Sequence, residues 1–155
     1  MTISVDEDTV ANILARRCAE HMWANDRASE HLGMAIESVA EGRAVLTMSV
    51  RENMVNGHDI CHGGLIFALA DSAFAFACNS QNHTTVAAGA TIDFLRPAQQ
   101  GDWLTAIATV VHQGGRNGIY DVVVTNQKDQ VIAQFRGRSS RIKGAVIADD
   151  GAGEA

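Results

Sequence analysis

One segment, HGGLIFALADSAFAFAC at residues 62–78, constrains the fold more than any other part of the chain. Residues 63–79 lack the alternation of a half-buried strand, form a run longer than a typical strand, and are built on Ala, Leu and Phe. These properties predict a helix that is apolar on nearly every side. A helix of this kind belongs inside the protein.

A single carboxylate, Asp71, interrupts this apolar segment. Burying a carboxylate without a partner is strongly unfavourable, and no Lys or Arg occurs between Glu52 and Phe94 to compensate for it. Ser, Thr or backbone donors can satisfy such a group. The alternative is a functional role, which we favour because violations of local rules concentrate at active sites.

Strands are predicted on both sides of the central helix. Two strands alternate about a Glu41-Gly42 turn, and further strands with hairpin turns between them follow the helix; the expected strands are 33–40, 43–50, 84–95, 102–113, 117–127 and 130–142. Apolar spacing also predicts an amphipathic helix over about residues 6–23. The predicted fold is therefore α+β, with a curved antiparallel β-sheet wrapped around a long central α-helix and an extra N-terminal helix.

The chain length of 155 residues, without a repeat or a linker, predicts a single domain over residues 1–155. The small and acidic tail from about residue 144 is predicted to be flexible. The N-terminus lacks the features of a secretory signal. The most apolar run, residues 63–70, is far shorter than the ~20 residues of a membrane span, so no membrane association is expected.

Cysteine usage and charge narrow the possible surroundings and partners. Cys18, Cys61 and Cys78 are odd in number and match no disulfide framework, which favours reduced thiols and a cytoplasmic location. A net charge of -6 argues against nucleic-acid binding. The segment QFRGRSSRIK at 134–143 is nevertheless basic, and it is either a solvated edge strand or a site for a phosphorylated ligand.

The start of the central helix offers a second candidate group. Gly63 and Gly64 follow His62 at the first turn, where backbone N–H groups have no acceptor within the helix. Such donors can hold an anion or form an oxyanion hole. Gly63 and Asp71 are eight residues apart, or about 12 Å along a helix, whereas reacting groups must lie roughly 3 Å apart. The spacing therefore predicts a homodimer in which two antiparallel helices share each site.

The loop before the helix supplies further polar groups. Asn56 can bind a carbonyl or position water, and His58 and His62 stand four residues apart. A zinc site is disfavoured because that spacing needs a helix and the glycines indicate a loop, so no metal is expected. Cys61 as a nucleophile with a neighbouring His is an equally weak alternative.

The segment VNGHDICHGGLIFALADSAFAFACNS resembles the hotdog-fold acyl-CoA thioesterases of the phenylacetate-degradation PaaI group. The likeness continues through TIDFLRPA, GDWLTA, YDVVV and FRGRSSRI, up to about residue 143. It implies a hotdog fold, and dimers that associate further into tetramers. It also implies that Asp71 is the catalytic carboxylate, that the Gly63 N–H is the oxyanion donor, and that Asn56 and His62 complete the site.

The resemblance implies a substrate that the spacing does not reveal, an acyl-CoA thioester such as phenylacetyl-CoA or a ring-hydroxylated derivative from aerobic phenylacetate breakdown. Asp71 would activate water or attack directly, and CoA is part of the substrate, so no separate cofactor is expected. Guanidinium groups suit CoA phosphates, and the candidates are Arg96, Arg136, Arg138 and Arg141.

One position departs from the family pattern. Some relatives place a Ser or Thr on the strand after the helix to assist the attacking water, whereas the register here puts Ala87 there. Thr84, Thr85 and Thr91 are the nearby substitutes. Two other functions fit the sequence less well. A hotdog enoyl-CoA hydratase needs an Asp-His dyad that is missing beside Asp71, and a non-catalytic acyl-CoA binding or sensing module leaves Asp71 without a role.

Overall fold

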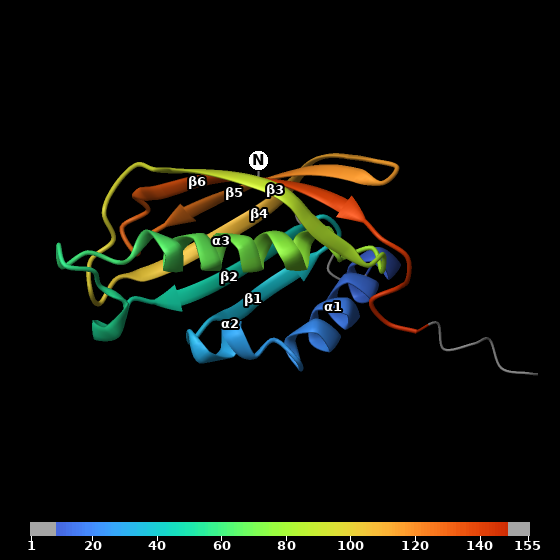
Figure 1. Ribbon diagram of the computed structural model, residues 1–155. Helices are drawn as coiled ribbons and strands as arrows, with labels where there is room; N and C mark the ends of the chain where they lie inside the picture. Colours follow the sequence, from blue (N-terminus) through green and yellow to red (C-terminus); the bar gives the residue numbers. More distant parts are fainter. Residues whose placement is uncertain (1–8, 149–155) are drawn as a thin grey trace, which may run out of the picture.

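The computed structural model describes residues 9–148 and contains one curved sheet around one long helix (Figure 1). The helix over 63–78 and all six predicted strands are present, with ends that differ from the predicted ones by a few residues at most. The elements are α1 (Val10–Trp23), α2 (Arg27–His31), β1 (Ala35–Ala40), β2 (Arg43–Ser49), the 3-10 turn η1 (Glu52–Met54), α3 (Gly63–Cys78), β3 (Thr85–Phe94), β4 (Trp103–Gly114), β5 (Asn117–Thr125) and β6 (Val131–Arg141).

The sheet is antiparallel throughout, with the strand order β1-β2-β4-β5-β6-β3. Hairpins join β1 to β2, β4 to β5 and β5 to β6, as the turn residues predict. The strand that follows α3 instead crosses to the far side of the sheet and pairs with β6. As a result β3 is an edge strand, and no strand of residues 9–148 occupies its other edge.

The core lies between α3 and the concave face of the sheet. Leu69, Phe74 and Phe76 of α3 are at most 1% exposed, because alternate residues of the strands point toward them. Gly137 of β6 shows how close the contact is, since a Cβ there would lie 2.7 Å from the ring of Phe74. The apolar character of α3 is thus explained by its position against the sheet.

The N-terminal helix packs beside β1. Its described part begins after Thr9, whose hydroxyl accepts the Asn12 N–H, whereas residues 6–8 of the predicted helix lie outside the described residues. Asn12 in turn accepts the backbone N–H of Glu41, which ties α1 to the β1–β2 turn. The five-residue helix α2 was not predicted, because it is too short to show a period; Asp26 caps it.

The beginning of the C-terminal tail, which the sequence predicts to be flexible from about residue 144, forms hydrogen bonds with the rest of the fold. The Thr84 N–H donates to the Gly144 carbonyl over 3.1 Å, and the side chain of Asn82 exchanges two hydrogen bonds with the backbone of Ile147. Residues 144–147 therefore belong to the folded part of the chain, and the remainder of the predicted tail, 149–155, lies outside the described residues.

None of the helices in residues 9–148 has the length and apolar character that crossing a membrane requires.

Candidate active site

The first turn of α3 leaves one backbone donor unused. His62 caps the helix, and its Nδ1 accepts the Gly64 N–H over 3.0 Å. The carbonyl of His62 accepts the next two N–H groups, those of Leu65 and Ile66. The Gly63 N–H has no acceptor among residues 9–148. The prediction that both glycines offer free N–H groups is thus wrong for Gly64, because His62 Nδ1 accepts the hydrogen bond of its N–H.

Gly63 opens onto a pocket of about 460 Å³ that also includes Asn56 and Arg96. The structure therefore brings together three of the residues predicted for the site, from the loop, the helix start and the segment after β3. His62 and Gly64 instead line an adjacent pocket of about 450 Å³. Residues of the loop before α3 line both pockets, Val55 the one with His62 and Asn56 the one with Gly63.

Phe94, which sequence reasoning did not single out, forms one wall of the Gly63 pocket. Its ring is packed so closely on Gly63 that a Cβ there would lie 3.1 Å from the ring. The side chain is 51% exposed at the end of the edge strand β3. A side chain at position 63 would therefore crowd the Phe94 ring.

Asn56 both builds the loop and presents a free group. Its Oδ1 accepts the N–H of His58 over 2.9 Å and that of Ile60 over 3.4 Å, and its backbone N–H donates to the Ile60 carbonyl. The carbonyl oxygen that the sequence offered as an acceptor for substrate or water is thus used locally. The Nδ2 donors have no partner among residues 9–148.

The same turn occurs a second time in the molecule, between β5 and β6. Asn126 Oδ1 accepts the N–H groups of Lys128 and Gln130, as Asn56 does with its own neighbours. There, however, the Asn126 Nδ2 donates to the Gln130 side chain over 3.0 Å. Asn56 therefore differs from Asn126 in one respect, its unoccupied amide donors.

Asp71 lies half-buried in the middle of α3 and has no hydrogen bond or ion pair among residues 9–148. Burial alone raises the pKa of its carboxyl group. The neighbouring Ser72 is by contrast hydrogen-bonded to Ser29 of α2. Because α3 is continuous from Gly63, the carboxylate and the free N–H of one chain are about 12 Å apart, as expected.

The predicted arginines do not form one cluster. Alternation along β6 places Arg136 and Arg138 on the outer face of the sheet. Arg136 is held there by Asp121 through two hydrogen bonds of 2.6 and 2.8 Å, which also lower the pKa of that carboxyl group. Arg141 lies near the end of α3, and Arg96 beside the Gly63 pocket.

The register of β3 separates the three candidate threonines. Thr91 pairs with Arg136 and so lies on the outer face, away from α3. Thr85 is buried and its hydroxyl donates to the carbonyl of His83. Thr84 precedes the strand. Ala87, which the sequence register puts at the position of the Ser or Thr of some relatives, pairs with the buried Ser139 of β6 and is itself exposed at the edge of the sheet.

The loop before α3 also contains the residues of the two alternative chemistries, a cysteine nucleophile and a metal site. Burial raises the pKa of Cys61 to about 11, so this residue is a thiol and not a thiolate at neutral pH. Among residues 9–148, no group of three His, Cys, Asp or Glu side chains is placed to hold a metal ion.

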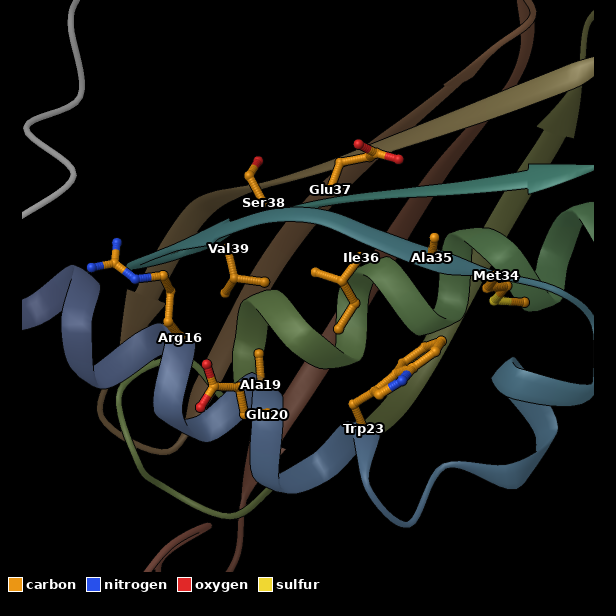
Figure 2. Close-up of a pocket in the computed structure, with 10 residues that line it drawn as sticks. All are labelled: Arg16, Ala19, Glu20, Trp23, Met34, Ala35, Ile36, Glu37, Ser38 and Val39. Carbon is orange, nitrogen blue, oxygen red and sulfur yellow. The ribbon is translucent and has the colours of Figure 1, made fainter.

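A separate groove of about 450 Å³ lies between α1 and β1 and contains no residue predicted for the site. Figure 2 shows Ile36 and Val39 pointing from β1 toward α1, whereas Glu37 and Ser38 point away. Trp23 closes the groove and packs against Phe76, with ring centroids 6.2 Å apart. The residues that line the groove are therefore those that hold α1 against the rest of the fold.

A curved sheet around a buried helix, with a free N–H at the helix start, defines a thioesterase of the hotdog class. Residues 58–133 match the family model of the thioesterase superfamily. The chain is 51% identical over 131 residues to the acyl-coenzyme A thioesterase PaaI of Escherichia coli K12. The matched residues cover 84% of this chain and 94% of that protein. A putative esterase of Archaeoglobus fulgidus is 34% identical, over 83% of this chain and 84% of its own.

Solved structures agree with this result. The E. coli PaaI structure matches with a TM-score of 0.85 over 86% of this chain and 96% of that chain, at 51% identity. A Streptococcus mutans protein bound to acetyl-CoA matches with a TM-score of 0.70 at 27% identity, over 72% and 90% of the two chains. The chain belongs to the PaaI group of hotdog-fold acyl-CoA thioesterases, and it hydrolyses acyl-CoA.

The unpaired Asp71 predicts a pH-dependent change in stability. Burial raises the pKa of the Asp71 carboxyl group in the folded protein above its value of about 3.9 in the unfolded chain. As the pH rises, the carboxyl group therefore ionises more readily in the unfolded chain, and this ionisation favours unfolding. We expect Asp71→Asn to raise Tm at neutral pH and to lose this advantage at a pH of about 3. Thermal unfolding at the two pH values measures the effect.

Asp121→Asn is the matched control, with the opposite sign. Arg136 lowers the pKa of Asp121, so its charge favours folding above the unfolded pKa. Its removal should lower Tm slightly at neutral pH and not in acid. Equal Tm values for wild type and Asp71→Asn at neutral pH would contradict the burial of an uncompensated charge.

The two similar turns allow a test of the free amide of Asn56. Asn56→Asp keeps an acceptor for the turn and removes the donors, so we expect an unchanged Tm and a loss of hydrolysis of about tenfold or more. Asn126→Asp makes the same change in the turn between β5 and β6, where it also removes the hydrogen bond to the Gln130 side chain; its Tm should therefore fall, whereas its turnover should remain at the wild-type value. Normal turnover by the Asn56→Asp enzyme would show that these donors are not used.

Proposed function

We propose that the protein hydrolyses arylacetyl-CoA, with phenylacetyl-CoA or a ring-hydroxylated derivative as substrate, in aerobic phenylacetate catabolism in the cytoplasm. The free Gly63 N–H, which opens onto a pocket with an aromatic wall, carries the proposal. The identity to the E. coli protein supports it, because that relative comes from a phenylacetic acid degradation operon. The three cysteines are free thiols, in keeping with a reducing compartment.

Each site is formed by two copies of the chain. One copy contributes Asp71, and its partner contributes the Gly63 N–H, because a single α3 holds the two groups about 12 Å apart. The unpaired edge of β3 supports this arrangement, since two such strands can pair about a two-fold axis and bring two α3 helices side by side. Two dimers then associate into a tetramer.

The chemistry follows from the two groups. Asp71 takes a proton from water, the resulting hydroxide attacks the thioester carbonyl carbon, and the Gly63 N–H stabilises the oxyanion. The carbon–sulfur bond then breaks, and the CoA sulfur receives the proton from Asp71. Direct attack by Asp71 gives a mixed anhydride that water hydrolyses to the same products. Asn56 and His62 orient the reacting groups.

The arginines differ in their suitability for the CoA phosphates. Arg96 lines the Gly63 pocket, and its guanidinium donates one hydrogen bond, to the Val131 carbonyl. Arg138 and Arg141 form no ion pair among residues 9–148. The guanidinium of Arg136 is already engaged by Asp121, so it is the least suited of the four.

The substrate proposal is tested by thiol release from a set of acyl-CoA thioesters. Phenylacetyl-CoA and its ring-hydroxylated derivatives should show a kcat/KM at least about tenfold above acetyl-CoA and straight-chain acyl-CoA, because a filled apolar pocket favours the larger group. A higher kcat/KM for the straight-chain thioesters would overturn the aryl preference.

The shared site is tested by mixing two inactive variants. Asp71→Ala removes the carboxylate, and Gly63→Pro removes the free N–H at the first helical position, where proline is tolerated. Random exchange of subunits makes half of the dimers mixed, and each mixed dimer has one intact site out of two. We therefore expect about a quarter of the wild-type activity. Gly63→Ala, which keeps the N–H, separates loss of the donor from crowding of Phe94. No recovery of activity after exchange, verified by mass spectrometry, would rule out the shared site.

A further inference from the structure

Beyond the C-terminal end of α3, three side chains form a chain of hydrogen bonds that the proposed chemistry does not use. Gln81 Nε2 donates to Glu41 Oε1 over 2.6 Å, and Arg141 Nη2 donates to Gln81 Oε1 over 2.5 Å. The three residues come from the β1–β2 turn, the turn after α3 and the end of β6. Distant parts of the sequence therefore converge on one arginine.

The two hydrogen bonds between these side chains can run in only one direction. A carboxylate accepts hydrogen bonds and a guanidinium donates them, so the Gln81 amide nitrogen must face Glu41 and its oxygen must face Arg141. Glu41 thereby sets the orientation of the Gln81 amide. Gln81 in turn holds the guanidinium without neutralising it, because an amide carries no charge.

Arg141 keeps both its charge and unused donors. Its backbone is fixed by a 2.8 Å hydrogen bond from its N–H to the Arg116 carbonyl. Its Nε is shielded from solvent and has no hydrogen-bond partner among residues 9–148. The contrast with Arg136, whose guanidinium is occupied by Asp121, is clear. A buried donor without a partner is unfavourable, and an anion would satisfy it.

The position of this arginine fits the CoA moiety. Asp71 lies seven residues before the end of α3, or about 10 Å, and Gln81 follows in the next turn of the chain. The Arg141 of a protomer therefore lies beyond its own Asp71 in the direction of the C-terminal end of α3. The pantetheine arm likewise separates the phosphates of CoA from the thioester.

We propose that Gln81, oriented by Glu41, is a positioning residue that holds Arg141 for a phosphate group of CoA. The inference rests on the proposed site, because it takes the reacting thioester to lie at Asp71. It assigns a function to Gln81 and Glu41, which do not touch the reacting atoms.

The test compares Gln81→Leu with wild type on two thioesters of the same acyl group, one of CoA and one of pantetheine, which lacks the phosphates. We expect KM for the CoA thioester to rise about five- to tenfold at unchanged kcat, with no change for the pantetheine thioester. Arg141→Met should raise the same KM at least as much. The double variant should be no worse than Arg141→Met, because Gln81 acts through that residue.

Two further variants separate positioning from structural damage. Glu41→Leu frees the Gln81 amide to turn and should raise KM for the CoA thioester alone. Gln127→Leu is the matched control, since Gln127 likewise joins a carboxylate, that of Asp102, to a donor, the Trp103 N–H; its kinetics should remain those of wild type.

An equal rise of KM for both thioesters in Gln81→Leu, or an unchanged KM for the CoA thioester, would overturn the proposal. The comparison uses whichever acyl group the wild type hydrolyses fastest. Failure of the arylacetyl preference therefore leaves this test valid, and the two failures remain distinguishable.

Discussion

Burial of the apolar helix α3 is the constraint on which the rest of the structure depends. Its fully buried residues need a continuous covering layer, and the concave face of the sheet provides it. The fit is close enough that Gly137 has no room for a side chain beside Phe74. Asp71 remains half-buried, on a part of α3 that the chain's own sheet does not fully cover. The same burial that stabilises the fold therefore leaves an uncompensated carboxylate.

The regularity of this helix also explains why the proposed chemistry needs two chains. A continuous helix carries a free N–H only at its first turn, and Asp71 lies eight residues further on. Neither group can approach the other without breaking the helix. The acceptor that His62 provides for Gly64 concentrates the donor function on Gly63. Two aligned helices satisfy both requirements without strain in either.

Local patterns in the sequence were reliable where one element determines the outcome. The composition of α3 and the alternation of the strands predicted their types and nearly their ends. The arginines of β6 were harder to interpret, because neighbours in a strand point to opposite faces. Arg136 is paired with Asp121, fifteen residues away, whereas Arg141 is held by Gln81. The helix α2 and the attachment of Gly144 also depend on contacts that no local period reveals.

The sequence by itself determined the six strands, the two longer helices, the family and the incompatible positions of Gly63 and Asp71, because hydrophobic period and helical rise are local properties. Only the tertiary structure decided which donors stay free. The Gly63 N–H and the Asn56 amide are available, whereas the Gly64 N–H and the Arg136 guanidinium are occupied. The physical reason is that a hydrogen-bonding group is free or used according to the neighbours that folding brings to it, and those neighbours come from other elements as well as from its own.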